Sequence, residues 1–116
     1  MVSEIAAGNV VIVKPSESTV QSSHVLKDII DRMDQKYFRC IEGGKDTSVF
    51  LNKLPFDHIS FTGSSKTGTF IAKDASANLS KLCLELGGCN YCVIDTTANL
   101  DLTAKRLVAS KFINCG

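Results

Sequence analysis

The sequence has almost no excess of either charge. Thirteen Lys and Arg side chains stand against twelve Asp and Glu, which gives a formal net charge of +1 over 116 residues. Proteins that bind nucleic acid or an anionic membrane surface through non-specific electrostatics carry a clear positive excess. We therefore expect neither of these partners.

Long apolar runs are also absent. The longest nearly unbroken one, residues 5–13, is interrupted by Gly8 and Asn9 and is far short of the ~20 residues that span a bilayer as a helix. The first four residues, Met-Val-Ser-Glu, lack the basic region of a secretory signal, so we expect a cytoplasmic location. The chain is 44% hydrophobic and 22% charged, an ordinary globular composition that excludes a disordered tail, a fibre and a coiled coil.

Disulfides are not expected, although the chain has five cysteines. An odd number without a secretory signal indicates free thiols in a reducing compartment. Cys89 and Cys92 form a C-x-x-C pair, but a structural zinc site needs a second pair of ligands, and this pair lies in a β-like run rather than at the start of a helix, where thiols are activated. Zinc or redox chemistry remains an alternative to ordinary buried or half-buried cysteines, and no metal site is predicted.

Short β-like runs alternate with helical patterns along the chain. Strands are expected at residues 10–13, 38–41, 59–61, 82–86 and 91–94, and helices at about 20–35, 46–51, 64–75 and 100–112. Strands that alternate with helices predict an α/β fold with a mainly parallel sheet. Ligands of such sheets bind beyond the carboxyl ends of the strands, so the residues that follow each strand are the candidates for function.

The run Phe-Thr-Gly-Ser-Ser-Lys-Thr-Gly at residues 61–68 is typical of a strand, a glycine turn and a helix start. The amides of residues 64–66 would point out of the helix N-terminus, where the helix dipole favours an anion. The glycine spacing differs from the G-x-G-x-x-G dinucleotide motif, and Thr69 stands where a P-loop requires lysine. A plain turn with a serine cap is the alternative.

Lys14 and Glu17 follow the first expected strand in the run Lys-Pro-Ser-Glu. A lysine can donate to a ribose hydroxyl, and a carboxylate can accept from the vicinal diol of a nucleoside ribose. The pair is therefore a candidate ribose site. A surface turn with two solvated charges is the alternative.

Glu85 lies near the end of the expected strand at residues 82–86. Alternation along a strand puts Leu84 and Leu86 on one face and Glu85 on the other. If both faces of the sheet are covered, Glu85 is partly buried and suited to act as a general base. A solvated glutamate is the alternative.

Taken together, these segments resemble the aldehyde dehydrogenase family. The runs at 6–17 (Ala-Ala-Gly-Asn-Val-Val-Ile-Val-Lys-Pro-Ser-Glu), 56–64 (Phe-Asp-His-Ile-Ser-Phe-Thr-Gly-Ser) and 84–88 (Leu-Glu-Leu-Gly-Gly) occur in the same order and spacing as in that family. The run at 112–116, Phe-Ile-Asn-Cys-Gly, looks like the one that leads into the family's catalytic cysteine. The tight spacing, and Phe-Asp-His-Ile in particular, is most similar to the class 3 branch, which oxidises fatty and aromatic aldehydes.

The resemblance covers nearly the whole chain and implies a Rossmann-like fold, with residues 1–116 forming part of an NAD(P)-binding domain. It implies NAD or NADP as the cofactor and an aldehyde as the substrate of the parent enzyme. Glu85 would activate the water that releases the acid. Lys14 and Glu17 would contact the adenosine ribose, and the backbone of Leu86 would contact the nicotinamide carboxamide. The remaining implied cofactor residues form the glycine turn and the helix start, where they hold the pyrophosphate or pack the helix against the strand: Gly63, Ser64, Ser65, Lys66, Thr67 and Gly68.

In that family a thiolate attacks the aldehyde, a hydride passes to the nicotinamide and water releases the acid. The resemblance places the nucleophile three residues beyond Gly116 and the oxyanion-hole asparagine upstream of Met1, so that Cys115 is not the nucleophile. Cys89 and Tyr91 depart from the lysine and the small residue or proline usual in the family. We therefore expect the 116-residue chain alone to be inactive.

The resemblance implies a homodimeric parent enzyme in a cytoplasmic location, with membrane association through a C-terminal segment as the alternative, since class 3 relatives often carry such anchors. The alternative function is a truncated nucleotide-binding or interaction module without chemistry.

Overall fold

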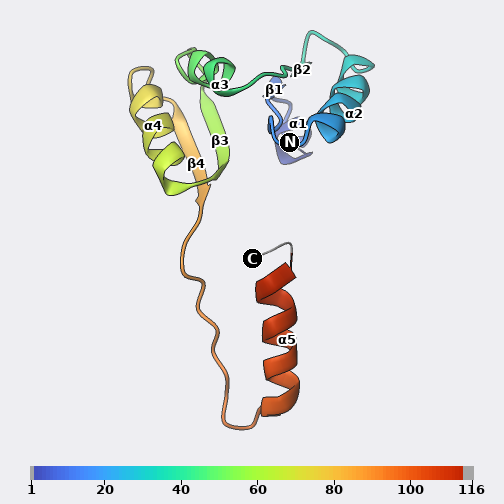
Figure 1. Cartoon of the computed structure of the whole chain (residues 1–116). Helices are drawn as coiled ribbons and strands as arrows, with labels where there is room; N and C mark the ends of the chain where they lie inside the picture. Colours follow the sequence, from blue (N-terminus) through green and yellow to red (C-terminus); the bar gives the residue numbers. More distant parts are fainter. Residues whose placement is uncertain (1, 114–116) are drawn as a thin grey trace.

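Strands and helices alternate along the chain, as the sequence predicts (Figure 1). The computed structural model describes residues 2–113, in the order α1 (Val2–Ala6), β1 (Val11–Val13), α2 (Val20–Asp31), β2 (Phe38–Cys40), α3 (Lys45–Asn52), β3 (His58–Gly63), α4 (Ser65–Ser76), β4 (Lys81–Leu86) and α5 (Leu100–Phe112). The predicted α/β class is confirmed. The sequence pattern predicts no helix at α1; only its last two residues belong to the apolar run 5–13, which the turn at Gly8, with φ +77°, divides.

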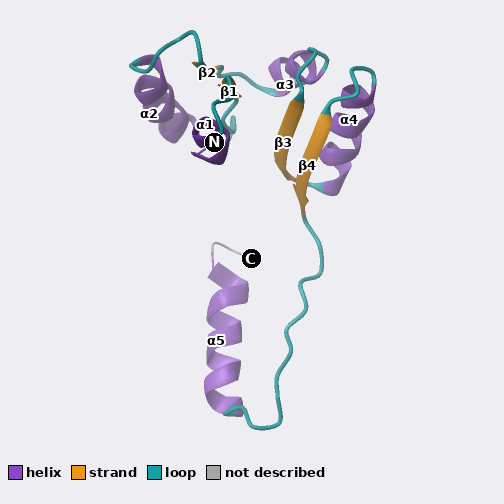
Figure 2. Cartoon of the chain, turned by 180° about the vertical axis from the view of Figure 1, so that it is seen from behind, coloured by secondary structure: helices purple, strands orange, loops and turns teal. Residues whose placement is uncertain are grey.

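The strands form two separate parallel pairs rather than one sheet (Figure 2). β1 pairs with β2, with Val11 opposite Phe38, and β3 pairs with β4, with His58 opposite Lys81. The predicted parallel direction is correct. The predicted single sheet is wrong for residues 2–113, because β1 and β3 line a cleft instead of bonding to each other.

The second pair has the better-developed core. Alternate residues of β3 and β4 are half-buried on the face that α4 covers, and Ile71 and Ala75 of α4 are buried against them. Gly68 allows this close approach, since a Cβ there would lie 2.7 Å from Leu86 Cδ2. The alternation of the strands and the helical spacing on α4 thus meet in one small core.

The first pair packs against α2. Ile30 of α2 and Cys40 of β2 are buried, together with the side chain of Ser23. Helix α2 ends at Asp31, four residues earlier than expected. The Gln35 side chain donates to the Ile30 carbonyl at 2.8 Å, and the Asp34 carboxylate accepts from the Lys36 amide at 2.9 Å, so polar side chains satisfy the backbone where the helix stops.

The prediction of a fifth strand at residues 91–94 is wrong. Tyr91 and Val93 are 98% and 94% exposed, and within the described residues no strand lies beside this segment. A β-like run needs a neighbour to satisfy its backbone groups, and here the chain runs out in extended form towards α5 (Figures 1 and 2). Helix α5 has the predicted bounds and is capped by Asn99, whose side chain accepts from the Leu102 amide at 3.0 Å.

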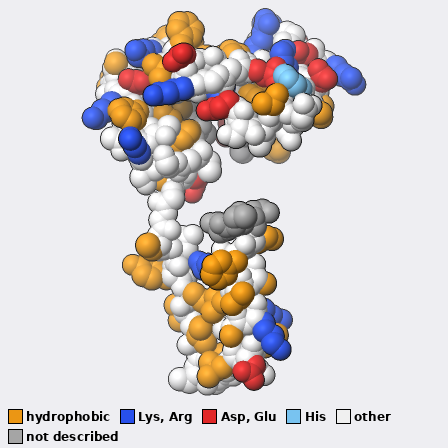
Figure 3. All heavy atoms as spheres, viewed as in Figure 1, with side chains coloured by type: hydrophobic (Ala, Val, Ile, Leu, Met, Phe, Trp, Pro, Cys, Tyr) orange, Lys and Arg blue, Asp and Glu red, His pale blue; other side chains and the backbone are white. Residues whose placement is uncertain are grey.

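The described chain is much more open than a self-contained domain of its size. Its radius of gyration is 18.4 Å, against about 13 Å for a compact domain of this length. Its accessible surface is 9160 Å², against about 6,200 Å² for a compact monomer of this mass. Helix α5 has no buried residue, and apolar side chains gather along it (Figure 3). No helix within residues 2–113 is long and apolar enough to cross a membrane.

Candidate functional site

The turn after β1 joins the two charged residues singled out by the sequence. Lys14 Nζ lies 3.2 Å from Glu17 Oε2 and donates to the Pro15 carbonyl at 2.8 Å. The Lys14 side chain is largely buried and that of Glu17 is more than half exposed. A hydrogen bond from its own backbone amide, followed by the bond from Lys14, lowers the pKa of the Glu17 carboxyl below its ordinary value. The turn therefore presents an ionised carboxylate at the carboxyl end of β1.

The glycine turn after β3 opens directly into α4. Ser64 caps the helix, since its Oγ accepts from the Thr67 amide at 3.2 Å. The amides of Ser65 and Lys66 have no hydrogen-bond partner within residues 2–113, so two donors point out of the positive end of the helix dipole. A Cβ at Gly63 would lie 2.5 Å from Phe61 Cζ, so a larger residue there would require the Phe61 ring to move. The helix start thus has the backbone chemistry of an anion site.

The strand register brings the second and third sequence motifs side by side. Thr62 lies opposite Glu85 and Gly63 opposite Leu86. The Gly87 amide donates to the Gly63 carbonyl at 3.2 Å. The Ser65 hydroxyl also donates to the Gly87 carbonyl at 3.4 Å. Two segments about 20 residues apart in the chain therefore form one end of the β3–β4 pair.

Glu85 is exposed in this arrangement. It lies on the face of the β3–β4 pair opposite α4, where the alternation of the strand predicted it. The conditional expectation of partial burial is not met, because within residues 2–113 no helix or strand covers that face. The position near the strand end fits a carboxylate that reaches solvent.

One cleft of about 1350 Å³ brings the ribose turn and the start of α4 together. Of the predicted cofactor residues, it is lined by Lys14, Glu17, Lys66 and Thr67. The predicted residues that do not line it are Gly63, Ser64, Ser65, Gly68, Glu85 and Leu86. Ligand sites usually enclose about 300–1,000 Å³, so this cleft has room for an extended ligand.

The sequence analysis missed several cleft residues and one smaller cavity. Lys45 and Phe70 also line the cleft. The smaller cavity, of about 240 Å³, opens between the turn after β1, the start of α2 and the end of β2, and its lining residues are Pro15, Ser16, Glu17, Val20, Ser23, His24, Glu42, Gly43 and Gly44. Three of these residues, Glu42, Gly43 and Gly44, directly follow the strand predicted at residues 38–41, where ligands of such sheets bind.

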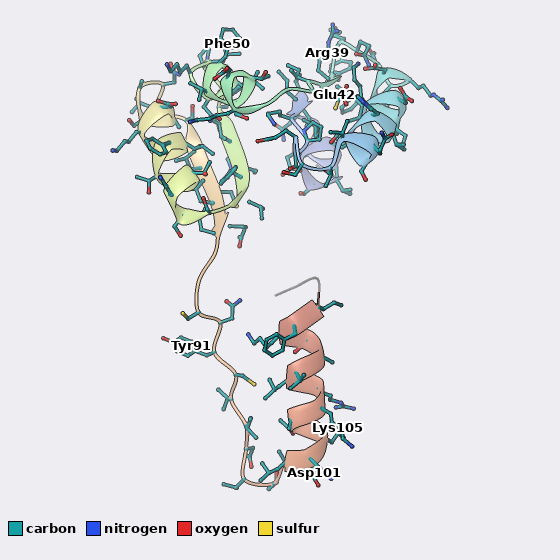
Figure 4. All side chains as sticks on the ribbon, viewed as in Figure 1. Arg39, Glu42, Phe50, Tyr91, Asp101 and Lys105 are labelled. Atoms are coloured by element: carbon teal, nitrogen blue, oxygen red, sulfur yellow. The ribbon has the colours of Figure 1, made fainter. Side chains whose placement is uncertain are left out.

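The side chains of His24 and Glu42 lie within hydrogen-bonding distance of each other at this smaller cavity. His24 Nδ1 lies 2.6 Å from Glu42 Oε1. Figure 4 shows Glu42 just beyond β2, on the side of α2. The pair joins α2 to the loop after β2 and places a second carboxylate in the cavity that Glu17 lines.

The cysteines are divided between the interior and the surface. Cys40 is buried, and burial raises the pKa of its thiol. Cys83, Cys89 and Cys92 are exposed, so the expectation of buried or half-buried cysteines holds for only one of the four described. Cys115 lies outside the described residues. Within residues 2–113, no group of three or more potential metal ligands comes together.

Comparison with known proteins decides the family. The sequence model of the aldehyde dehydrogenase family matches residues 1–116. The chain belongs to the aldehyde dehydrogenase family. It is 40% identical to the 4,4'-diaponeurosporen-aldehyde dehydrogenase of Staphylococcus aureus over 100% of this chain and 26% of that protein. It is 36% identical to aldehyde dehydrogenase family 3 member A2 of Rattus norvegicus, over 100% of this chain and 24% of that protein. The predicted similarity to the class 3 branch is confirmed.

Solved aldehyde dehydrogenases share the fold. A substrate-bound AldH of Staphylococcus aureus has a TM-score of 0.85 at 41% identity, over 92% of this chain and 24% of that one. The lactaldehyde dehydrogenase of Escherichia coli has a TM-score of 0.79 at 31% identity, over 90% of this chain and 23% of that one. The chain thus spans about a quarter of the length of its aldehyde dehydrogenase relatives and matches part of a Rossmann-like domain.

Proposed function

We propose that residues 1–116 are part of the NAD(P)-binding domain of an enzyme that oxidises an aldehyde to a carboxylic acid. The observation that carries this proposal is the cleft shared by two strand ends. Lys14 and Glu17 reach it from the end of β1, and Lys66 and Thr67 reach it from the start of α4. One side of the cleft offers groups for a ribose diol, and the other offers a helix N-terminus for a phosphate.

The residues present fit a dinucleotide. Glu17 is ionised and can accept from two ribose hydroxyls, while Lys14 lies beside it as a donor. The unpaired amides of Ser65 and Lys66 can donate to a pyrophosphate oxygen. When bound, NAD or NADP supplies the hydride acceptor for the oxidation of the aldehyde.

The part of Glu85 in this proposal is to accept a proton from the water that releases the acid. Its carboxylate is solvent-exposed, and the space around Gly87 and Gly88 is open, since a Cβ built at either would meet nothing within 4 Å. A water molecule can therefore approach the carboxylate. A general base in this position contributes to acyl-enzyme hydrolysis rather than to hydride transfer.

The finer parts of the proposal concern the whole enzyme. The name of the Canis lupus familiaris relative, 39% identical over 100% of this chain and 26% of that protein, calls it dimeric and NADP-preferring. By analogy with this relative, we propose that the parent enzyme of this chain is a homodimer and uses NAD or NADP. We also propose a cytoplasmic location and no aldehyde oxidation by the 116-residue chain alone.

A segment chimaera tests the proposal. In it, this chain replaces the matched 117-residue segment of the staphylococcal aldehyde dehydrogenase. We expect the chimaera to form NADH or NADPH from an aldehyde, and a Lys14→Met, Glu17→Gln double variant to raise the KM for the cofactor. A folded chimaera that binds the cofactor but oxidises no aldehyde would instead support the alternative, a non-catalytic nucleotide-binding module.

A further inference from the structure

The smaller cavity holds a carboxylate that the proposed function does not use. We propose that Glu42, held in place by His24, makes this site select NAD over NADP by excluding a phosphate from the 2′ position of the ribose. This inference rests on the proposed cofactor function. Glu42 is then a specificity-determining residue, and His24 is a positioning residue that acts through it.

The location of the cavity is the first argument. Pro15, Ser16 and Glu17 line both the large cleft and the smaller cavity. A ribose bound by Glu17 from the cleft therefore has the smaller cavity next to it. The Glu17 carboxylate would bind the 2′ hydroxyl of this ribose. A group added at that hydroxyl has to enter the space that Glu42 lines.

The second argument is that the groups around this cavity are held in place. His24 Nδ1 and Glu42 Oε1 are 2.6 Å apart, and the Glu42 side chain is only 28% exposed. Buried Ser23 Oγ lies 3.0 Å from the Ser16 carbonyl and 2.9 Å from the Thr19 carbonyl. The turn after β1 is thus tied to α2, and α2 is tied to the end of β2.

The third argument is the balance of charge. The charged or protonatable side chains in the lining are Glu17, Glu42 and His24, and no lysine or arginine is among the lining residues of this cavity. Sites that accept a 2′-phosphate place an arginine near it. Lys45, which directly follows Gly44 in the chain, lines the large cleft rather than this cavity. A 2′-phosphate here would meet two carboxylates, and like charges brought together disfavour the wrong ligand.

The remaining nearby cations are already paired. Lys14 is bonded to Glu17, and Lys27 of α2 is bonded to Asp31. Neither of these lysines lines the smaller cavity. Lys27 also interacts electrostatically with Glu42, but its hydrogen bond to Asp31 is the larger interaction.

The test compares NAD and NADP on the full chain and on the segment chimaera. Dissociation constants come from NMR titration of the chain, and kcat/KM values with each cofactor come from the chimaera. We expect Glu42→Gln to raise the preference for NADP relative to NAD by about tenfold, the order expected for removing one like charge at a partly exposed site. Its affinity for NAD should change by less than about twofold on the same scale. The matched control, Asp28→Asn, removes a carboxylate from the exposed side of α2 away from either cavity and should leave the ratio unchanged.

His24→Asn separates positioning from direct binding. If His24 holds Glu42, this variant raises the NADP preference in the same direction as Glu42→Gln, but by less. A loss of NADP affinity alone would mean that His24 binds the phosphate and would overturn the proposal. An unchanged ratio in Glu42→Gln would overturn it as well, with the cofactor function intact. Failure of a folded chimaera to use either cofactor would overturn the proposed function itself.

Discussion

The two strand pairs reach the same cleft with different chemistry. The β1–β2 pair contributes mainly side chains, namely Lys14 and Glu17, with His24 and Glu42 in the adjoining cavity. The β3–β4 pair contributes mainly backbone, through the glycine turn and the free amides at the start of α4. The backbone donors belong to the pair with six-residue strands, where Gly68 lets α4 lie close to Leu86.

This contrast separates selectivity from affinity. A helix N-terminus attracts any phosphate, so the β3–β4 pair can hold the pyrophosphate of either cofactor. Charged side chains distinguish one ribose from another, so discrimination is assigned to the β1–β2 pair.

Glu85 is the exception, because it is a side chain with a chemical role on the backbone-dominated pair. In the segment chimaera, Glu85→Gln should leave a burst of NADH near one equivalent per site. Steady-state turnover should then fall by about 10²–10⁴-fold, the usual contribution of a general base. Rapid-mixing kinetics measure both phases. Lys81→Gln, an exposed change on the same strand face, is the control, and normal turnover in Glu85→Gln would refute the general-base assignment.

Gly43 is an exception of the opposite kind. It follows β2 in the pair that contributes mainly side chains, but its own importance lies in its backbone conformation. Its φ is +154°, and a Cβ there would lie 2.7 Å from Thr47 Cβ in the first turn of α3. Gly43→Ala should therefore destabilise the chimaera by about 1–3 kcal/mol, measured by urea denaturation. At Gly44 a Cβ would meet nothing within 4 Å. Gly44→Ala should cost less, and equal losses at the two positions would contradict the strained backbone at Gly43.

Ser64 tests the backbone chemistry of the β3–β4 pair. Its Oγ caps α4 by accepting from the Thr67 amide, and loss of such a cap costs about 1 kcal/mol. Ser64→Ala should lower the stability of the chimaera by that amount and weaken NAD and NADP equally. Ser76→Ala, which removes a hydroxyl at the other end of α4, is the matched control. A change in the ratio of the two cofactors would instead place discrimination at the glycine turn.

Much of this division could be predicted from the sequence, because it depends on patterns among residues that are close together in the chain. Alternation of Leu82 and Leu84 with Glu85, helical spacing on α4 and the glycine turn all depend on neighbours within a few residues. The false strand at residues 91–94 has the same local signal, but a strand exists only where another strand lies beside it. The pairing of His24 with Glu42 was also beyond the sequence, since it joins a helix to a strand end 18 residues away.

The smallest expected effect concerns the state of the Glu17 carboxylate. Its own backbone amide and Lys14 lower its pKa from the ordinary 4.5, so it should stay ionised below that pH in the folded chain. A lowered folded pKa contributes stability above the unfolded pKa, and this contribution disappears as the pH falls below 4.5 through the folded value. Carboxyl-detected NMR titration of the chain measures the shift. Lys14→Met should remove only part of it, because the backbone amide is the larger cause. Asp95, whose pKa is lowered by the Thr97 amide, should titrate unchanged in that variant. A Glu17 that titrates at 4.5 or above would mean that the turn after β1 does not hold the carboxylate ready for a ribose.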